Sequence, residues 1–196
     1  MLKAHLILAI LWILFCVFHS LLASNDIKRS VAVHLPRFSK NYRFFYTLFS
    51  FASLAVVLIY QIRLDTPSII NKSFILDAAG IIIGITGMAI MAICIRKYFL
   101  SLSGLKSLVS EHAVANELRV DGIHQYVRHP LYLGTFLFIW GLWLIIPNLS
   151  ILIANIIITV YTLIGIRLEE RKLVDEFGES YRAYRRRVPM IFPLFR

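Results

Sequence analysis

The feature that most constrains this chain is a series of apolar runs about as long as a bilayer is thick. An apolar α-helix needs roughly 20 residues to cross the hydrocarbon core. The runs cover residues 4–23, 43–62, 74–95, 131–146 and 149–166. The mean hydropathy of +0.74 is also above that of soluble domains of this length. The sequence therefore predicts an all-α, polytopic helical membrane protein with about five transmembrane helices.

The carboxyl-terminal third has its own pattern. Pro147 and Asn148 separate the last two apolar runs, and this turn signal predicts an antiparallel helical hairpin. The basic tail that follows places Phe177, Tyr181 and Tyr184 three or four residues apart, which is typical of an amphipathic helix at a membrane surface. We expect this cytoplasmic tail to act as a lid over a site.

The net charge of +10 is compatible with nucleic-acid binding, but the hydropathy favours another cause. Basic residues accumulate in the cytoplasmic loops of membrane proteins. In the five-span arrangement the first loop, the third loop and the tail hold 18 Lys and Arg, and the opposite side holds 3. This distribution predicts an integral protein of the cytoplasmic or inner membrane, with the N-terminus outside and the C-terminus inside. Its expected partners are membrane lipids and no nucleic acid.

Metal binding is not predicted. The two cysteines, Cys16 and Cys94, lie far apart in apolar segments, and no cysteine–histidine cluster has the spacing of zinc ligands. Both cysteines are expected to be small packing residues.

Polar residues concentrate at the cytoplasmic end of the predicted hairpin. Residues 122–134 read GIHQYVRHPLYLG, and residues 165–193 read GIRLEERKLVDEFGESYRAYRRRVPMIFP. Since a short turn joins the two spans, "RHPLY" and "RLEE" are expected to meet at the interface. Polar groups near membrane depth are costly unless they pair or line a cavity. One interpretation is a single pocket built from Arg128, His129, Tyr132, Arg167, Glu169 and Glu170; the other is a set of interfacial anchors.

These two segments resemble the isoprenylcysteine carboxyl methyltransferase and phospholipid methyltransferase superfamily. The resemblance covers roughly residues 100–194 and consists of an RHPxYxG block, a Glu-Glu pair and an FGxxYxxYxxxVP tail. "FHSLLAS" and "YRFFY" in the first two spans are similar to a narrower branch, the nurim-like proteins and bacterial methanethiol S-methyltransferases. The resemblance implies one membrane domain over residues 1–196. Its three amino-terminal spans end at residue 95, and a methyltransferase core covers residues 96–194.

The family's cofactor, S-adenosylmethionine, is implied with its contacts. The resemblance assigns these contacts to Leu118, Arg119, His124, His129, Pro130, Tyr132 and the first glutamate of the pair, Glu169. Two positions depart from the family pattern. His124 stands where a tyrosine is common. The family also places a substrate-side arginine about one turn before the glutamate. Here the nearest arginine, Arg167, precedes Glu169 by only two residues, so it points to another face of the helix.

Methyl transfer asks the protein to align donor and acceptor and to exclude water. The residues considered for catalysis are Arg128, Arg167 and His19; the alternative for His19 is a helix-end histidine bonded to a carbonyl. The branch resemblance favours a small thiol as acceptor, and a lipophilic thiol or carboxylate, as in a phospholipid or isoprenylcysteine methyltransferase, is second. A non-catalytic, nurim-like membrane scaffold stays open as a different class of function. No oligomeric state is predicted.

Overall fold

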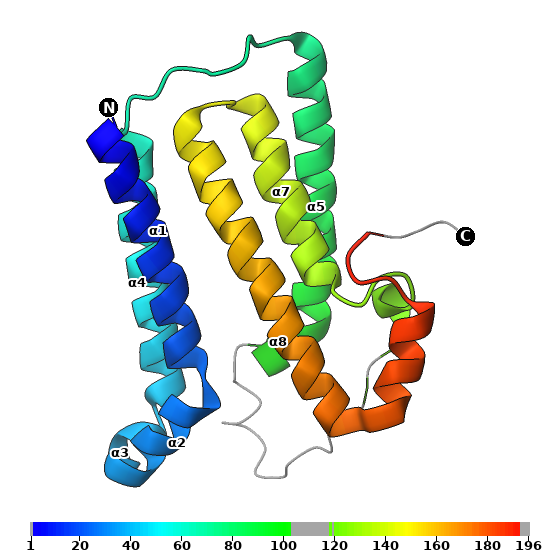
Figure 1. Ribbon diagram of the computed structural model, residues 1–196. Coiled ribbons are helices and arrows are strands. Elements are labelled where there is room, and N and C mark those ends of the chain that lie inside the picture. The colour runs from blue at the N-terminus through cyan, green and yellow to red at the C-terminus, as the bar shows by residue number, and fades with distance from the viewer. Residues whose placement is uncertain (1, 103–117, 119, 193–196) are drawn as a thin grey trace. The chain divides into compact units, whose positions relative to one another are not determined.

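The computed structural model describes residues 2–102, 118 and 120–192, with residues 97–102 described as backbone only. Its contacts divide the chain into two compact units. Unit 1 comprises residues 1–71 and 146–161, and unit 2 comprises residues 72–145 and 162–196. Throughout the described residues the regular elements are helices, so the predicted all-α class is confirmed (Figure 1). The single-domain organisation with a division at residue 95 stays a prediction.

Unit 1 is built on two long apolar helices, α1 (Leu2–Ala23) and α4 (Tyr42–Arg63), joined through α2 (Asn25–His34) and α3 (Pro36–Ser39). Leu8 and Trp12 of α1 form a buried cluster with Val57 and Ala154. Trp12 Nε1 donates a hydrogen bond of 2.8 Å to Gln61 Oε1. This bond satisfies the one polar atom that the indole brings into the apolar contact.

Four of the described helices are long and apolar enough to cross a membrane: α1, α4, α5 (Phe74–Leu102) as far as Arg96, and α8 (Leu149–Arg187). The shorter apolar helix α7 (Pro130–Ile145) has 16 residues and is about 24 Å long, less than the hydrocarbon core of about 30 Å. The chain is therefore a polytopic helical membrane protein. Five as the number of spans stays a prediction.

Unit 2 depends on close contact between α5 (Phe74–Leu102) and α7, which lie side by side (Figure 1). Glycines face each other along this contact. A Cβ on Gly87 would lie 2.5 Å from the Phe138 nitrogen, and one on Gly80 would lie 2.7 Å from the Gly141 oxygen. In lipid, helices associate through packing rather than through the hydrophobic effect, so small residues at the contact decide how near the backbones come.

The long helix α8 (Leu149–Arg187) begins at an effective cap, since Asn148 Oδ1 accepts a 2.9 Å hydrogen bond from the Ile151 nitrogen. It bends at Gly178, whose φ of 55° lies in the left-handed region that favours glycine. Beyond the bend, Tyr181, Tyr184 and Val188 form a buried cluster, and the partly buried Phe177 packs against it. The predicted amphipathic helix is therefore present, but its aromatic face is buried within unit 2.

The glycine contact predicts opposite effects for two neighbouring substitutions. Gly87→Ala places a methyl group against the α7 backbone, so we expect the free energy of unfolding to fall by about 1–3 kcal/mol. Gly84→Ala is the matched control, because its Cβ meets nothing within 4 Å. There the better helix propensity of alanine is expected to leave stability unchanged or raised by up to about 1 kcal/mol. Unfolding midpoints measured by circular dichroism in detergent test both, and equal effects would contradict the close α5–α7 contact.

Candidate active site

The RHP block enters α7 through a tight turn. A single 3₁₀ turn, η1 (Gly122–Gln125), begins at Gly122, whose φ is 61°. Pro130 then opens α7, where its missing N–H costs nothing and its fixed φ suits the first helical turn. The two residues before Pro130 bond to the chain's tail, because the Arg128 nitrogen donates to the Pro189 oxygen at 2.9 Å and the His129 nitrogen to the Met190 oxygen at 3.1 Å.

Glu170 on α8 is the centre of the polar cluster. Arg128 donates to Glu170 Oε1 from Nε at 2.7 Å and from Nη2 at 2.6 Å. His129 Nε2 donates to the same oxygen at 3.2 Å, and the Tyr181 hydroxyl donates to it at 3.3 Å. The Glu170 and Arg128 side chains are only 12% and 9% exposed. This one carboxylate therefore joins α8, the RHP block and the limb beyond Gly178.

The electrostatics follow from this arrangement. The limb of α8 before Gly178, residues 149–177, is about 44 Å long, more than the hydrocarbon core of about 30 Å, so the part beyond the apolar run at residues 149–166 is expected to lie outside the core. Burial raises the pKa of Glu170. The hydrogen bond and the charge of Arg128, with a contribution from His129, lower this pKa by more than burial raises it, so the net pKa lies below the ordinary value. Burial and the nearby Glu170 charge raise the pKa of Tyr181, so it stays a neutral donor.

Arg128 also anchors the tail. Its Nη1 donates to the Arg185 and Val188 carbonyl oxygens. A further bond runs from the Tyr184 hydroxyl to the His124 oxygen at 2.6 Å. The tail is thus bonded to the site by side chains and backbone together. The lid prediction remains untested, but these contacts make the tail a wall of the cluster.

Glu169 faces a different set of groups. The Tyr132 hydroxyl donates to Glu169 Oε2 at 3.1 Å, and His129 Nδ1 lies 3.9 Å from the same oxygen. The rings of His129 and Tyr132 lie 5.8 Å apart. Since 47% of the Glu169 side chain is exposed, its carboxylate is open to a ligand, whereas the Glu170 carboxylate is enclosed. The two adjacent glutamates have separate environments.

The other residues implied by the resemblance are partly accounted for. His124 Nδ1 donates to the Arg128 oxygen at 3.2 Å, so its imidazole supports the RHP turn. Leu118 packs against the cluster of Tyr181 and Tyr184. Pro130 is fully buried. Arg119 lies outside the described residues.

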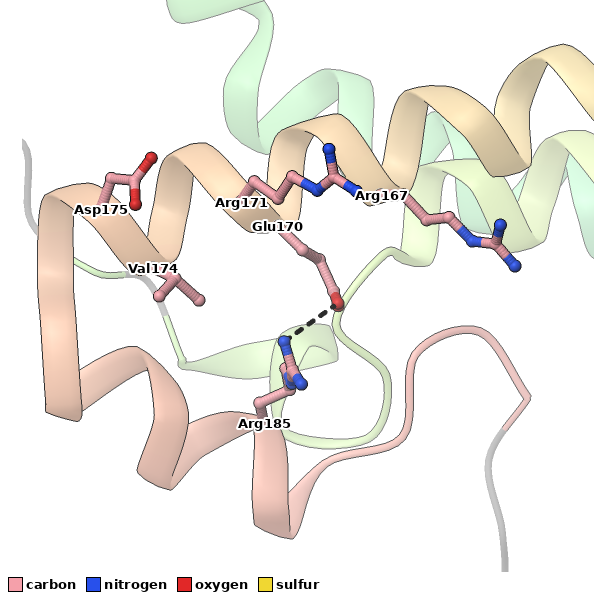
Figure 2. Close-up of a pocket in the computed structure, with 6 residues that line it drawn as sticks. All are labelled: Arg167, Glu170, Arg171, Val174, Asp175 and Arg185. Carbon is pink, nitrogen blue, oxygen red and sulfur yellow. Dashed lines mark ion pairs between the residues drawn. The ribbon is translucent and has the colours of Figure 1, made fainter.

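Arg167 is not beside Glu169. It lines a pocket of about 330 Å³ formed with Glu170, Arg171, Val174, Asp175 and Arg185 (Figure 2). The expectation that Arg167 points to another face of α8 than Glu169 agrees with this placement. The six residues interpreted as one pocket at the hairpin end therefore fall into separate groups. Arg128 and His129 bond to Glu170, and Tyr132 bonds to Glu169. Arg167 lines a neighbouring pocket, which Glu170 also lines.

His19 lies in unit 1. Its ring nitrogens are 3.2 Å from the Tyr46 hydroxyl, and Nδ1 is 3.3 Å from Ser50 Oγ. These hydrogen-bonding partners are side-chain hydroxyls, whereas the structural alternative for His19 was a bond to a backbone carbonyl. Its role in catalysis stays a prediction.

Sequence reasoning placed Glu170 in the polar cluster but gave it no role, and it treated Tyr181 only as part of an aromatic face. The aromatic spacing places Tyr181 on the apolar face of an amphipathic helix. Its bond to Glu170 depends on the reversal of the chain at Gly178, which spacing alone does not reveal.

The Arg128 contacts predict that Arg128→Lys releases the tail. An ammonium group cannot reproduce the fork of donors that reaches Glu170 and two tail carbonyls at once. We expect cleavage by trypsin after the tail arginines to become at least several-fold faster in detergent, with the helix content unchanged. Arg182→Lys, an exposed position outside this network, is the control. Unchanged cleavage of Arg128→Lys would contradict the anchoring role.

Sequence comparisons match this chain to one protein family and to several named methyltransferases. The family model described as "Protein of unknown function (DUF1295)" matches residues 7–188. Two Bradyrhizobium diazoefficiens proteins named methanethiol S-methyltransferase 1 and 2 are 28% and 30% identical over 97% of this chain, which spans 67% and 74% of their lengths. The Schizosaccharomyces pombe protein-S-isoprenylcysteine O-methyltransferase is 34% identical over 52% of this chain and 47% of its own length.

No solved structure matches the chain with significant similarity. The family model covers nearly the whole chain, and the relatives carry the names of the superfamily and of the narrower branch that the motifs resemble. This chain belongs to the DUF1295 family, within the superfamily of integral-membrane methyltransferases.

Proposed function

We propose that the protein is an S-adenosylmethionine-dependent methyltransferase of the cytoplasmic membrane whose acceptor is a small thiol. The observation that carries this proposal is the open Glu169 carboxylate beside Tyr132 and His129, in a chain of this family.

The residues present fit the proposed methyl donor. Ribose hydroxyls and an ammonium group are donors, and the open carboxylate of Glu169 accepts charge-assisted hydrogen bonds from such groups. His129 and Tyr132 offer ring faces and polar edges to an adenosine. When bound, the cofactor supplies a methyl group on a good leaving group. Leu118, Arg119, His124 and Pro130 complete the proposed binding set.

The remaining polar residues position this site. Arg128 holds Glu170 and the tail, so we assign it to the architecture of the site rather than to contact with the reacting atoms. Glu170 accepts from His129 Nε2 and thereby fixes the orientation of the ring whose other nitrogen faces Glu169. Arg167 and His19 remain weaker candidates for the acceptor side.

The acceptor class is argued from chemistry and from the relatives. The thiolate rather than the thiol is the nucleophile, so the site must favour loss of the thiol proton before the sulfur takes the methyl group. The relatives aligned along nearly the whole chain are named for methanethiol. Relatives from Schizosaccharomyces pombe and Rattus norvegicus are named for protein-S-isoprenylcysteine, which makes a prenylated cysteine carboxylate the second candidate.

The proposed orientation places this site on the cytoplasmic side, with the N-terminus outside. The basic residues of the α1–α4 connection and of the tail support it, since Lys and Arg accumulate on the cytoplasmic side. A water-soluble cofactor then enters from the cytoplasm, and an apolar acceptor enters from the membrane.

An acceptor assay tests the proposal. Purified protein with radiolabelled S-adenosylmethionine is expected to methylate short alkanethiols in preference to a prenylated cysteine. Tyr132→Phe removes the hydrogen bond to Glu169 and is expected to lower the rate about three- to tenfold. Tyr126→Phe, an exposed tyrosine, is the control. A preference for the prenylated cysteine would overturn the thiol assignment, and no transfer to either acceptor would favour the scaffold.

A further inference from the structure

A concave pocket lies beside the proposed donor site, at the bend of α8. Its lining residues are Arg167, Glu170, Arg171, Val174, Asp175 and Arg185, and its volume is about 330 Å³, within the range of small-ligand sites. Five of the six come from one stretch of α8, and Arg185 reaches back from the limb beyond Gly178. Figure 2 shows the Arg185 and Glu170 side chains pointing toward each other from these two limbs.

The charges of this pocket are not balanced. Glu170 is already paired with Arg128, which does not line the pocket, at 2.6 Å. Arg185 lies 4.0 Å from Glu170 Oε2 and is 52% exposed. Within the described part of the chain, Arg167 and Arg171 form no ion pair that would neutralise them. Three guanidinium groups therefore surround the pocket with Asp175 as the only further carboxylate in its lining.

The pocket also lies at a defined depth. The apolar run of α8 ends at residue 166, and Arg167 is the next residue. At 1.5 Å per residue, Arg167 and Arg171 lie about 1.5 and 7.5 Å beyond that end. The headgroup layer on each side of the hydrocarbon core is about 5–8 Å thick. For a helix along the bilayer normal, this spacing puts Arg167 and Arg171 within the headgroup layer.

The pocket is distinct from the open Glu169 carboxylate. Glu169 does not line it, and two residues along a helix turn the side chain by about 200° from Arg167. Glu169 instead contacts Tyr132 and His129. A ligand in the pocket would meet guanidinium groups rather than the groups proposed to hold the methyl donor.

We infer that this pocket binds a phosphate-type anion. Arginine forks match phosphate oxygens with paired, charge-assisted hydrogen bonds, and three arginines line this pocket with too few carboxylates to balance them. The phosphodiester of an anionic membrane lipid and free phosphate share this chemistry. The depth of the arginines favours the lipid source.

The experiment uses the full chain purified in a non-ionic detergent. Two probes are added separately: inorganic phosphate, followed by calorimetry, and phosphatidylglycerol against phosphatidylcholine, followed by native mass spectrometry. Arg171→Gln and Arg185→Gln remove one guanidinium each and are expected to weaken binding about tenfold. Lys172→Gln and Arg182→Gln lose the same charge outside the pocket and are expected to change it less than about twofold.

The possible outcomes distinguish a lipid phosphate, a soluble phosphate and the absence of an anion site. Retention of phosphatidylglycerol over phosphatidylcholine that falls only in the pocket variants supports the inference and identifies the lipid as source. Phosphate binding with the same dependence, and no lipid preference, supports it with a soluble source. Equal effects of all four variants, or no binding of either probe to the wild type, overturn it. If Arg171→Gln loses helix content, Arg171→Lys replaces it, and an intermediate loss is expected because the charge stays and the fork is lost.

Discussion

The enclosed ion pair between Arg128 and Glu170 is the interaction on which the described site depends. Removing two charges from water is expensive, and such a pair persists only when geometry is good and further hydrogen bonds satisfy both partners. Here Glu170 also accepts from His129 and Tyr181, and Arg128 also donates to two tail carbonyls. Losing either partner leaves a charge buried without compensation, so this pair holds together the RHP block, the part of α8 around Glu170 and the tail.

This pair also explains why two adjacent glutamates have different roles. The Glu170 carboxylate is enclosed and bonded to structural partners. Glu169, one residue earlier and about 100° around the helix, contacts Tyr132 and keeps its carboxylate half exposed. A rigid, enclosed carboxylate holds His129 in place for the open one. The arrangement separates support of the site from contact with a ligand, which is what a binding site on rigid elements requires.

Sequence reasoning anticipated the elements better than their connections. The apolar runs gave the helices, and the turn at Pro147–Asn148 led to the expectation that the RHP block meets the Glu-Glu pair, which the contacts of Arg128 and Tyr132 confirm. Which glutamate is enclosed could not be predicted, because that depends on the reversal at Gly178 and on the tail carbonyls around Arg128. The burial of the amphipathic tail was missed for the same reason, since periodicity identifies an apolar face but not what covers it.

The central claim is that Glu169 is the open carboxylate of a methyl-donor site. Calorimetric titration of S-adenosylmethionine into the detergent-purified protein, Glu169→Ala and Glu176→Ala tests it most directly. Glu176 is an exposed carboxylate further along α8 and serves as the control. The account predicts saturable binding to the wild type and Glu176→Ala, and binding at least tenfold weaker to Glu169→Ala. Absence of binding to folded wild-type protein, or equal binding by all three, would contradict it.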